Sequence, residues 1–272
     1  MEECIQVNDG LTLERKTIVE FMREGPRSTG QSGHWLQFAM DVPVRGGSDG
    51  LDMTGLALNA SMDISLRDRH GLDQDVKLFF SVANVVMDAF IACWEAKRYY
   101  DTSRPYWWVR LYHKGETIEG WRGPGQGAGK LKAEDWKPYS PDTFLTPPFP
   151  GYVSGHATAS GAASRMLELF TGSDRYGATA LQQAGELTEP GMSAALMQAR
   201  DGVPAAGLPE SKQVLLSLPT FTATAEMAAL SRLWGGYHIR TDNDEGLILG
   251  RKIAMYSWPK HQAYFDGTAA SN

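Results

Sequence analysis

Three separated segments of the chain combine cationic, hydroxyl and imidazole groups. Their residues are Lys97, Arg104 and Pro105 in the first, Ser154, Gly155 and His156 in the second, and Ser231, Arg232, His238 and Asp242 in the third. A hydrophobic core avoids such groups, because burying unpaired polar atoms costs free energy. An enclosed tetrahedral oxyanion requires them, since its oxygens accept charge-assisted hydrogen bonds from cations and from N–H or O–H donors. The sequence therefore predicts an oxyanion site built from three distant segments.

The composition is that of an ordinary globular protein and argues against two classes of partner. Of the 272 residues, 42% are hydrophobic and 21% are charged, which suffices for one large domain or two small ones. The formal net charge of −6 opposes a general affinity for nucleic acid or for an anionic membrane, because both attract a basic excess. We expect neither as a partner, and we expect any anion site to be local.

The N-terminus and the cysteines indicate the compartment. The segment MEECIQVNDG carries acidic residues where a signal peptide carries basic ones, and no stretch approaches the roughly 18 to 20 uninterrupted apolar residues of a membrane span. Cys4 and Cys93 are too few for a disulfide framework. We expect a cytoplasmic protein without a membrane anchor, and a leader missing from this sequence is the alternative.

Periodic apolar spacing predicts helices along most of the chain and therefore an all-α helical bundle. The expected helices cover residues 11–24, 75–100, 155–170, 220–234 and 242–258. Residues 186–216 are weakly patterned, and we assign no chemistry to them.

Lys97 lies near the end of the expected helix 75–100. That helix carries one stripe at steps of three and four residues, which consists of Phe79, Ala83, Val86, Phe90, Trp94 and Lys97. A solvated lysine is the common arrangement, and the stripe offers the alternative that Lys97 points inward. Arg104 follows two helical turns later, so both cations can lean toward one anion before Pro105 ends the helix.

The third segment should contain a turn between Arg232 and His238. Gly235 and Gly236 lie between them and would cost roughly 2 kcal/mol in a helix interior. In one continuous helix the two side chains would point about 120° apart, whereas a turn lets both aim at one point. The final helix then begins near Asp242, with Glu245 three residues on as in a capping box.

Residues 105–153 show neither helical nor strand periodicity and are rich in Gly, Pro and Trp. A connection of this length is uncommon unless it builds a site or is disordered, and its tryptophans and prolines favour an ordered loop over the site. Ser154 is a suitable N-cap for the helix that follows. The Gly155 amide then lies at a helix N-terminus, where N–H groups and the helix dipole attract negative charge.

Three local motifs suggest other chemistry and fail on their residues. The segment 123–130 (GPGQGAGK) is not a phosphate-binding loop, because Pro124 replaces its first glycine and Leu131 its hydroxyl residue. Ser154 stands in GYVSGH and lacks the G-x-S-x-G pattern of a hydrolase nucleophile. A second Ser-Gly-His at 32–34 precedes Trp35 without a comparable helix, and we interpret it as structural.

The three segments together resemble the signature of the vanadium-dependent haloperoxidases and of the type 2 phosphatidic-acid-phosphatase-like acid phosphatases. The matching spacings are Lys97-x6-Arg104-Pro105, Ser154-Gly155-His156 and Ser231-Arg232-x5-His238-x3-Asp242. One departure is Val153, where the family usually has proline; it loosens the loop without removing a donor. The segments TIVEFMREGP, CWEAKRYYDTSRP and TPPFPGYVSGHAT are similar to the bacterial haloperoxidase branch.

The resemblance implies a role for each residue of the set. Vanadate would be held through its oxygens by Lys97, Arg104, Ser154, Gly155 and Arg232, with His238 as the ligand of vanadium. Asp242 would fix the tautomer of His238, and His156 would perform acid–base work, so that the catalytic group comprises His156, His238, Lys97 and Asp242. Trp94 and Phe149 resemble an aromatic pair on the halide side, although simple packing explains them equally well.

The activity implied by the resemblance is vanadate-dependent oxidation of halide by hydrogen peroxide. The product, a hypohalous acid equivalent, would halogenate small organic substrates. The alternative enzyme is a soluble acid phosphatase, in which phosphate occupies the same cage and His238 attacks phosphorus. A noncatalytic oxyanion-binding protein is the alternative from another class, and the two imidazoles argue against it. We expect one helical domain over residues 1–272, without the upstream bundle that related enzymes carry; a homodimer would cover apolar faces left exposed.

Overall fold

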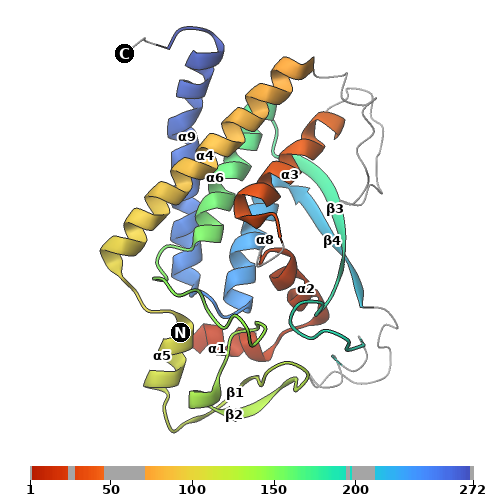
Figure 1. Ribbon diagram of the computed structural model, residues 1–272, viewed down its shortest axis with the longest axis vertical. Coiled ribbons are helices and arrows are strands. Elements are labelled where there is room, and N and C mark those ends of the chain that lie inside the picture. Colours follow the sequence, from red (N-terminus) through yellow and green to blue (C-terminus); the bar gives the residue numbers. More distant parts are fainter. Residues whose placement is uncertain (1, 24–27, 46–70, 194–196, 198–211, 270–272) are drawn as a thin grey trace.

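The computed structural model describes residues 2–23, 28–45, 71–193, 197 and 212–269. Long helices run along the length of the molecule and form its core, in agreement with the expected all-α bundle (Figure 1). They are α3 (Gly30–Arg45), α4 (Gly71–Tyr100), α6 (Gly155–Thr171), α8 (Phe221–Trp234) and α9 (Arg240–Phe265). Two shorter helices, α1 (Glu2–Asp9) and α2 (Leu13–Phe21), precede them.

Helix α6 occupies the centre of the bundle and packs against α3, α4, α8 and α9. It can do so because its buried positions are mostly alanine, serine and glycine, which allow neighbouring backbones to approach. The approach is closest to α9. A β-carbon on Gly250 of α9 would lie 2.1 Å from the Thr158 carbonyl oxygen, and one on Gly161 of α6 would lie 2.6 Å from the Leu247 carbonyl oxygen. The two helices therefore touch backbone to backbone.

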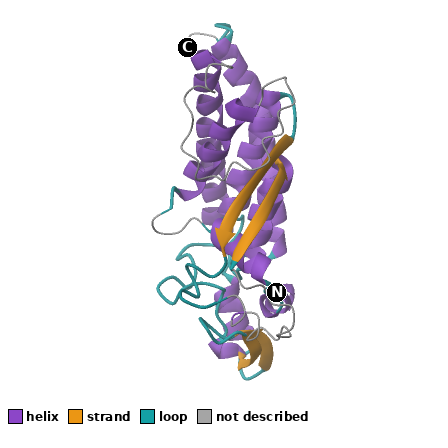
Figure 2. Ribbon diagram, turned by 90° about the vertical axis from the view of Figure 1, so that its right-hand side faces the viewer, coloured by secondary structure: helices purple, strands orange, loops and turns teal. Residues whose placement is uncertain are grey.

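Two antiparallel ribbons accompany the helices, and the sequence analysis predicted neither of them. Strands β3 (Arg175–Gln183) and β4 (Gln213–Thr220) form a ribbon along one side of the bundle (Figure 2). Strands β1 (Thr117–Trp121) and β2 (Ala128–Lys132) form a small hairpin at one end, near α1 and α5 (Pro105–Tyr112). The 3₁₀ turn η2 (Ala133–Asp135) follows β2. The stretch 105–153 is thus only partly the irregular loop that we expected.

The expected helix boundaries hold near the site and shift elsewhere. Expected helix 11–24 is shorter, because α2 begins after the N-cap Thr12 and ends at Phe21, while Gly25 and Pro26 lie outside the described residues. The final helix begins at Arg240 and continues through Pro259 to Phe265, well beyond the expected end at 258. The Ser-Gly-His at 32–34 lies inside α3, contrary to our expectation that no helix carries it. Part of the weakly patterned stretch 186–216 lies outside the described residues.

Helix α4 is more apolar than the sequence analysis allowed. Within the described residues, the stretch Leu72–Tyr112 is long and apolar enough to cross a membrane by length and composition alone, and 39% of its most apolar window is buried. It contains no uninterrupted apolar run of that length, because Ser81, Asn84 and Asp88 lie among its apolar residues, so the expectation of no uninterrupted run holds. Its inner face packs on α3, α6 and α9, as the core helix of a soluble protein also would.

Candidate oxyanion site

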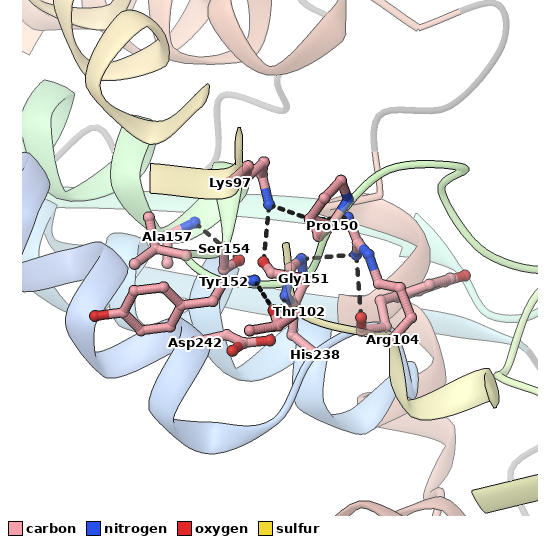
Figure 3. A network of polar contacts seen from close by, with 12 residues as sticks. Lys97, Thr102, Arg104, Pro150, Gly151, Tyr152, Ser154, Ala157, His238 and Asp242 are labelled. Carbon is pink, nitrogen blue, oxygen red and sulfur yellow. Dashed lines mark hydrogen bonds and ion pairs between the residues drawn. The ribbon is translucent and has the colours of Figure 1, made fainter. Parts of the chain in front are cut away.

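The three polar segments meet at one end of the bundle. The C-terminal turn of α4 contributes Lys97, the N-terminus of α6 contributes Ser154, and the turn between α8 and α9 contributes His238 (Figure 3). The loop residues Pro150 and Gly151 lie between these elements and are held by hydrogen bonds from the cations. The structure therefore brings together groups that are far apart in the sequence.

Lys97 points inward, as the apolar stripe suggested, and it is 2% exposed. Its Nζ atom donates hydrogen bonds to the carbonyl oxygens of Pro150 and Gly151, each at 2.8 Å (Figure 3). Burial lowers the pKa of Lys97 to about 8, because desolvation disfavours the ammonium form, and the nearby Arg104 adds to this effect. Two members of the predicted stripe, Ala83 and Trp94, are nevertheless exposed, so the buried face is rotated relative to the prediction.

Arg104 is the buried N-cap residue of α5, and Pro105 is the first residue of that helix. The prediction that Pro105 ends a helix is wrong: α4 ends at Tyr100, and proline is well suited to a first helical position because it needs no N–H partner. The Arg104 guanidinium donates to His238 Nε2 at 2.9 Å and to the carbonyl oxygens of Phe149 and Tyr237. Burial, followed by repulsion from Arg232, lowers its pKa to about 10.

His238 and Asp242 form a buried pair. The Nδ1–H of His238 donates to Asp242 Oδ2 at 2.9 Å, which leaves Nε2 as the acceptor of the Arg104 hydrogen bond. This pattern assigns the Nδ1–H tautomer. Burial, with the positive charges of Arg104 and Lys97, holds the pKa of His238 well below its usual range, so its imidazole is neutral. Burial raises the pKa of Asp242 to about 6.

The same geometry corrects the expected capping box. Helix α9 has Ile239 as its N-cap, without a side-chain cap, and Asp242 lies within the first turn. Its carboxylate is turned toward His238, which occupies the position four residues earlier in the chain. The backbone of Asp242 also belongs to the site, since its carbonyl oxygen accepts from the Ser154 N–H at 2.8 Å.

Arg232 lies buried in the last turn of α8, and its guanidinium covers the Tyr237 ring at 4.3 Å. The predicted break in the helix lies directly after Arg232. Helix α8 ends at Trp234, and Gly236 has a φ of +76°, a conformation that favours glycine. The turn returns the chain, so that the His238 N–H lies 3.3 Å from the Arg232 carbonyl oxygen. Arg232 contributes positive charge to the surroundings of both His238 and His156.

Ser154 and Gly155 start α6 as predicted. Ser154 is the N-cap, with its hydroxyl accepting from the Ala157 N–H at 3.5 Å, and Gly155 is the first helical residue. The first turn of a helix presents N–H groups without helical partners and the positive end of the dipole. This end of α6 therefore adds to the positive potential of Lys97 and Arg104.

His156 lies one residue further along α6 and contacts residues from the other side of the site. Its Nδ1 accepts from the Gln31 amide at 2.7 Å, and its Nε2–H donates to the Arg23 carbonyl oxygen at 3.1 Å. Burial, followed by the charge of Arg232, holds the pKa of His156 well below its usual range. Both of its ring nitrogens are thus engaged, one by Gln31 of α3 and one by Arg23, which lies after the end of α2.

Trp94 and Phe149 form the expected aromatic pair, with ring centroids 4.7 Å apart. The Phe149 ring lies 5.6 Å from Lys97 Nζ and 5.0 Å from Arg104 Cζ, within the range of cation–π contacts. Both aromatic side chains are exposed, so the pair separates the buried cations from solvent.

Sequence reasoning missed several residues that support the site. Thr102 accepts from the Tyr152 N–H through its hydroxyl at 2.8 Å and from the Gly151 N–H through its carbonyl at 2.9 Å, and so anchors the loop that contacts Lys97 (Figure 3). Gln31 and Arg23 hold His156. Nothing in their local sequence marks them, because their importance comes from the tertiary approach of Arg23 and of α3 to α6.

Comparison with known proteins assigns the family. Residues 77–267 match the VCPO second helical-bundle domain, and the chain therefore belongs to this family of the vanadium haloperoxidases. Comparison with curated proteins gave no match.

Three solved structures share the fold at 22% sequence identity. The first is a holo-type bacterial vanadium-dependent chloroperoxidase, with a TM-score of 0.73 and coverage of 96% of this chain and 46% of that chain. The second is an apo-type bacterial vanadium-dependent chloroperoxidase, with a TM-score of 0.71 and coverage of 98% of this chain and 49% of that chain. The third is a bacterial vanadium-dependent iodoperoxidase, with a TM-score of 0.58 and coverage of 95% of this chain and 48% of that chain. The chain spans about half the length of these relatives.

Proposed function

We propose that this site binds orthovanadate and uses it to oxidise halide with hydrogen peroxide. The observation that carries the proposal is that Lys97 and Arg104 are buried beside the neutral acceptor nitrogen of His238, while in the described part of the chain no carboxylate contacts either cation. Their hydrogen-bond partners are carbonyl oxygens and an imidazole, which leave their positive charges available to an anion. Such a donor set fits a tetrahedral oxyanion.

The residues that would hold the anion divide by the atom they contact. Lys97, Arg104, Arg232, Ser154 and Gly155 would donate to its oxygens, and His238 Nε2 would hold the central atom. Arg104 donates to that same Nε2 lone pair, so Arg104 must transfer its hydrogen bond to the anion when His238 takes the central atom. Asp242 keeps the proton on Nδ1 and thus keeps Nε2 as the electron-pair donor.

Vanadate bound there would supply a Lewis-acidic centre that activates hydrogen peroxide toward halide. His156 would exchange protons with peroxide, for which it must release either Gln31 or the Arg23 carbonyl oxygen. Trp94 and Phe149 would limit access of water and bound the path of the halide. Hydrogen peroxide, a halide and a small organic acceptor are the proposed substrates.

The test is bromination of a phenolic dye by the purified chain with peroxide and bromide, with and without added orthovanadate. We expect activity only with vanadate, and competition by phosphate. His238→Ala should abolish both activity and vanadate retention, while Lys212→Met, at a surface ion pair with Glu186, should preserve both. Absence of vanadate-dependent bromination across roughly pH 5 to 8 would contradict the proposal.

An acid phosphatase is the second candidate, and the His238–Asp242 pair favours it specifically. A neutral imidazole, oriented by a carboxylate at 2.9 Å, also suits attack on phosphorus. Rapid hydrolysis of p-nitrophenyl phosphate that vanadate only inhibits would assign this activity instead. Binding of vanadate without turnover of either substrate would assign a noncatalytic oxyanion-binding protein.

A further inference from the structure

Gln31, in the first turn of α3, directs its amide nitrogen at His156. Its Nε2 atom lies 2.7 Å from His156 Nδ1 and 3.2 Å from His156 Nε2. The Arg23 carbonyl oxygen, 3.1 Å from His156 Nε2, can only accept a hydrogen bond, so Nε2 carries the proton of the neutral ring. His156 Nδ1 is then an acceptor and requires an N–H donor from Gln31. The orientation of the Gln31 amide is therefore fixed by a backbone carbonyl.

This orientation leaves Gln31 Oε1 as a buried acceptor, and none of the described residues donates a hydrogen bond to it. Burying an acceptor without a donor costs free energy. The atom lies against the N-terminus of α6, since a β-carbon on Gly155 would be 3.8 Å from Oε1. Gly155 is the residue whose N–H would donate to an oxygen of the bound anion. An unpaired acceptor thus lies beside one of the proposed donors of the oxyanion site.

The groups proposed to contact the anion oxygens are otherwise donors. They are the side chains of Lys97, Arg104, Arg232 and Ser154 and the N–H of Gly155. Donors alone hold any tetrahedral oxyanion. An acceptor adds selectivity, because a protonated oxygen can donate to it, whereas a deprotonated oxygen is repelled by its lone pairs. Near pH 7, phosphate and orthovanadate carry at least one proton, and sulfate carries none.

We propose that Gln31 selects protonated tetrahedral oxyanions, by accepting a hydrogen bond at Oε1 from an O–H group of the bound anion, and that it thereby disfavours sulfate. A site that hydrogen-bonds a hydroxyl group rejects an analogue without one, because its own polar group is then left unpaired. Gln31 is thus a specificity-determining residue in addition to being the partner of His156. The proposal rests on the oxyanion site of the proposed function.

Calorimetric titration of the purified chain with inorganic phosphate and with sulfate, near pH 7, tests this selection. The wild-type chain should bind phosphate roughly 10 to 100-fold more tightly than sulfate, as expected for one buried acceptor that is paired with one anion and not with the other. Gln31→Met keeps the length of the side chain and removes the acceptor, so phosphate should bind more weakly and sulfate more tightly. Gln37→Met is the matched control, because Gln37 is exposed on the same helix, and it should leave the ratio unchanged.

The opposite directions of these two changes separate selection from a purely structural role. If Gln31 only held His156 in place, Gln31→Met would weaken phosphate and sulfate equally, and that result would overturn the proposal. Gln31→Glu keeps an acceptor at the same position and should still reject sulfate. Loss of discrimination in a Gln31→Glu variant with unchanged circular dichroism would also overturn the proposal.

The same measurements distinguish this proposal from halide oxidation. Selection of phosphate over sulfate that depends on Gln31, in a chain that does not brominate, would support the selection and contradict only the halide-oxidising activity. Equal affinity of the wild-type chain for both anions, together with vanadate-dependent bromination, would overturn only the selection. A chain that binds no tetrahedral oxyanion would overturn both.

Discussion

Two buried lysines in this protein have opposite electrostatic surroundings. Lys16 of α2 is fully buried, with Nζ 2.9 Å from Glu189 Oε2, and Tyr139 donates to the same carboxylate oxygen. Lys97 of α4 is equally buried, but its Nζ donates hydrogen bonds to the carbonyl oxygens of Pro150 and Gly151, and among the described residues no carboxylate pairs with it. Lys16 is neutralised within the fold, whereas the charge of Lys97 is only solvated by dipoles. The difference separates a cation whose charge is paired within the structure from one whose charge is left available to an anion.

The largest expected effect is the loss of stability when the neutralised pair is broken. Lys16→Met should lower the free energy of unfolding by about 3–5 kcal/mol, because the Glu189 carboxylate is left buried without its counter-ion. Lys212→Met, at a partly exposed pair, should cost less than about 1 kcal/mol. Urea unfolding measures the loss of stability in both variants. Equal losses would show that the buried Lys16–Glu189 pair contributes no more to stability than the partly exposed Lys212–Glu186 pair.

Lys97 should show its uncompensated charge as a dependence of stability on pH. Its pKa falls from 10.5 to about 8 on folding, so between these values the unfolded state binds more protons and stability rises with pH. Relative to Lys97→Met, the wild-type free energy of unfolding should increase by an amount on the order of 3 kcal/mol from pH 8 to pH 10.5. Bound phosphate or vanadate should suppress the increase, because an anion favours the ammonium form. A difference between the two proteins that stays constant with pH would contradict this account.

Asp242 extends the comparison between the surroundings of Lys16 and Lys97. It is a buried carboxylate that accepts a hydrogen bond from His238 and does not contact Lys97. Asp242→Asn should weaken vanadate affinity by roughly 10 to 100-fold, as is usual for groups that orient a ligating histidine. Equilibrium dialysis measures the affinity. Tyr139→Phe, which removes the hydrogen bond from Tyr139 to Glu189 beside Lys16, should leave vanadate affinity unchanged. Equal effects of the two variants would show that the clusters are not independent.

The smallest expected effect concerns the backbone that solvates Lys97. Thr102→Val removes the hydroxyl that accepts from the Tyr152 N–H and should cost about 1 kcal/mol of stability. Thr102→Ser retains the hydroxyl and should restore most of the loss. Thermal unfolding of the two variants checks the prediction. Identical unfolding temperatures for Thr102→Val and Thr102→Ser would exclude this role for the hydroxyl.

The sequence allowed the prediction of most of the cage and of the helices that carry it. The helices at 155–170 and 220–234, the inward Lys97 and the turn at Gly235 and Gly236 follow from periodicity and glycine chemistry, which are local properties. Strand β3 escaped notice although Tyr176, Ala178 and Ala180 alternate inward, because alanine gives a weak period-two signal. The role of each cage residue in catalysis stays a prediction.

The remaining errors concern residues whose role or partner is decided by the tertiary structure. Asp242 matches an N-cap by spacing, but His238 takes its carboxylate. Pro105 is compatible with either end of a helix, and only the tertiary structure decides which. Gln31 reaches His156 across 125 positions of sequence, a distance over which no local pattern carries information.

The backbone contact between α6 and α9 sets how finely the site can be tuned by mutation. Ser154 is the N-cap of α6 and Asp242 lies in the first turn of α9, and the Ser154 N–H donates to the Asp242 carbonyl oxygen at 2.8 Å, so the relative position of the helices fixes that of the polar groups. Sliding one helix along the other by a single residue would move these groups by about 1.5 Å. Displacements of about 1 Å can cost on the order of a hundredfold in rate. Gly250 and Gly161, which carry no functional group, should therefore tolerate substitution as poorly as the residues of the proposed anion site.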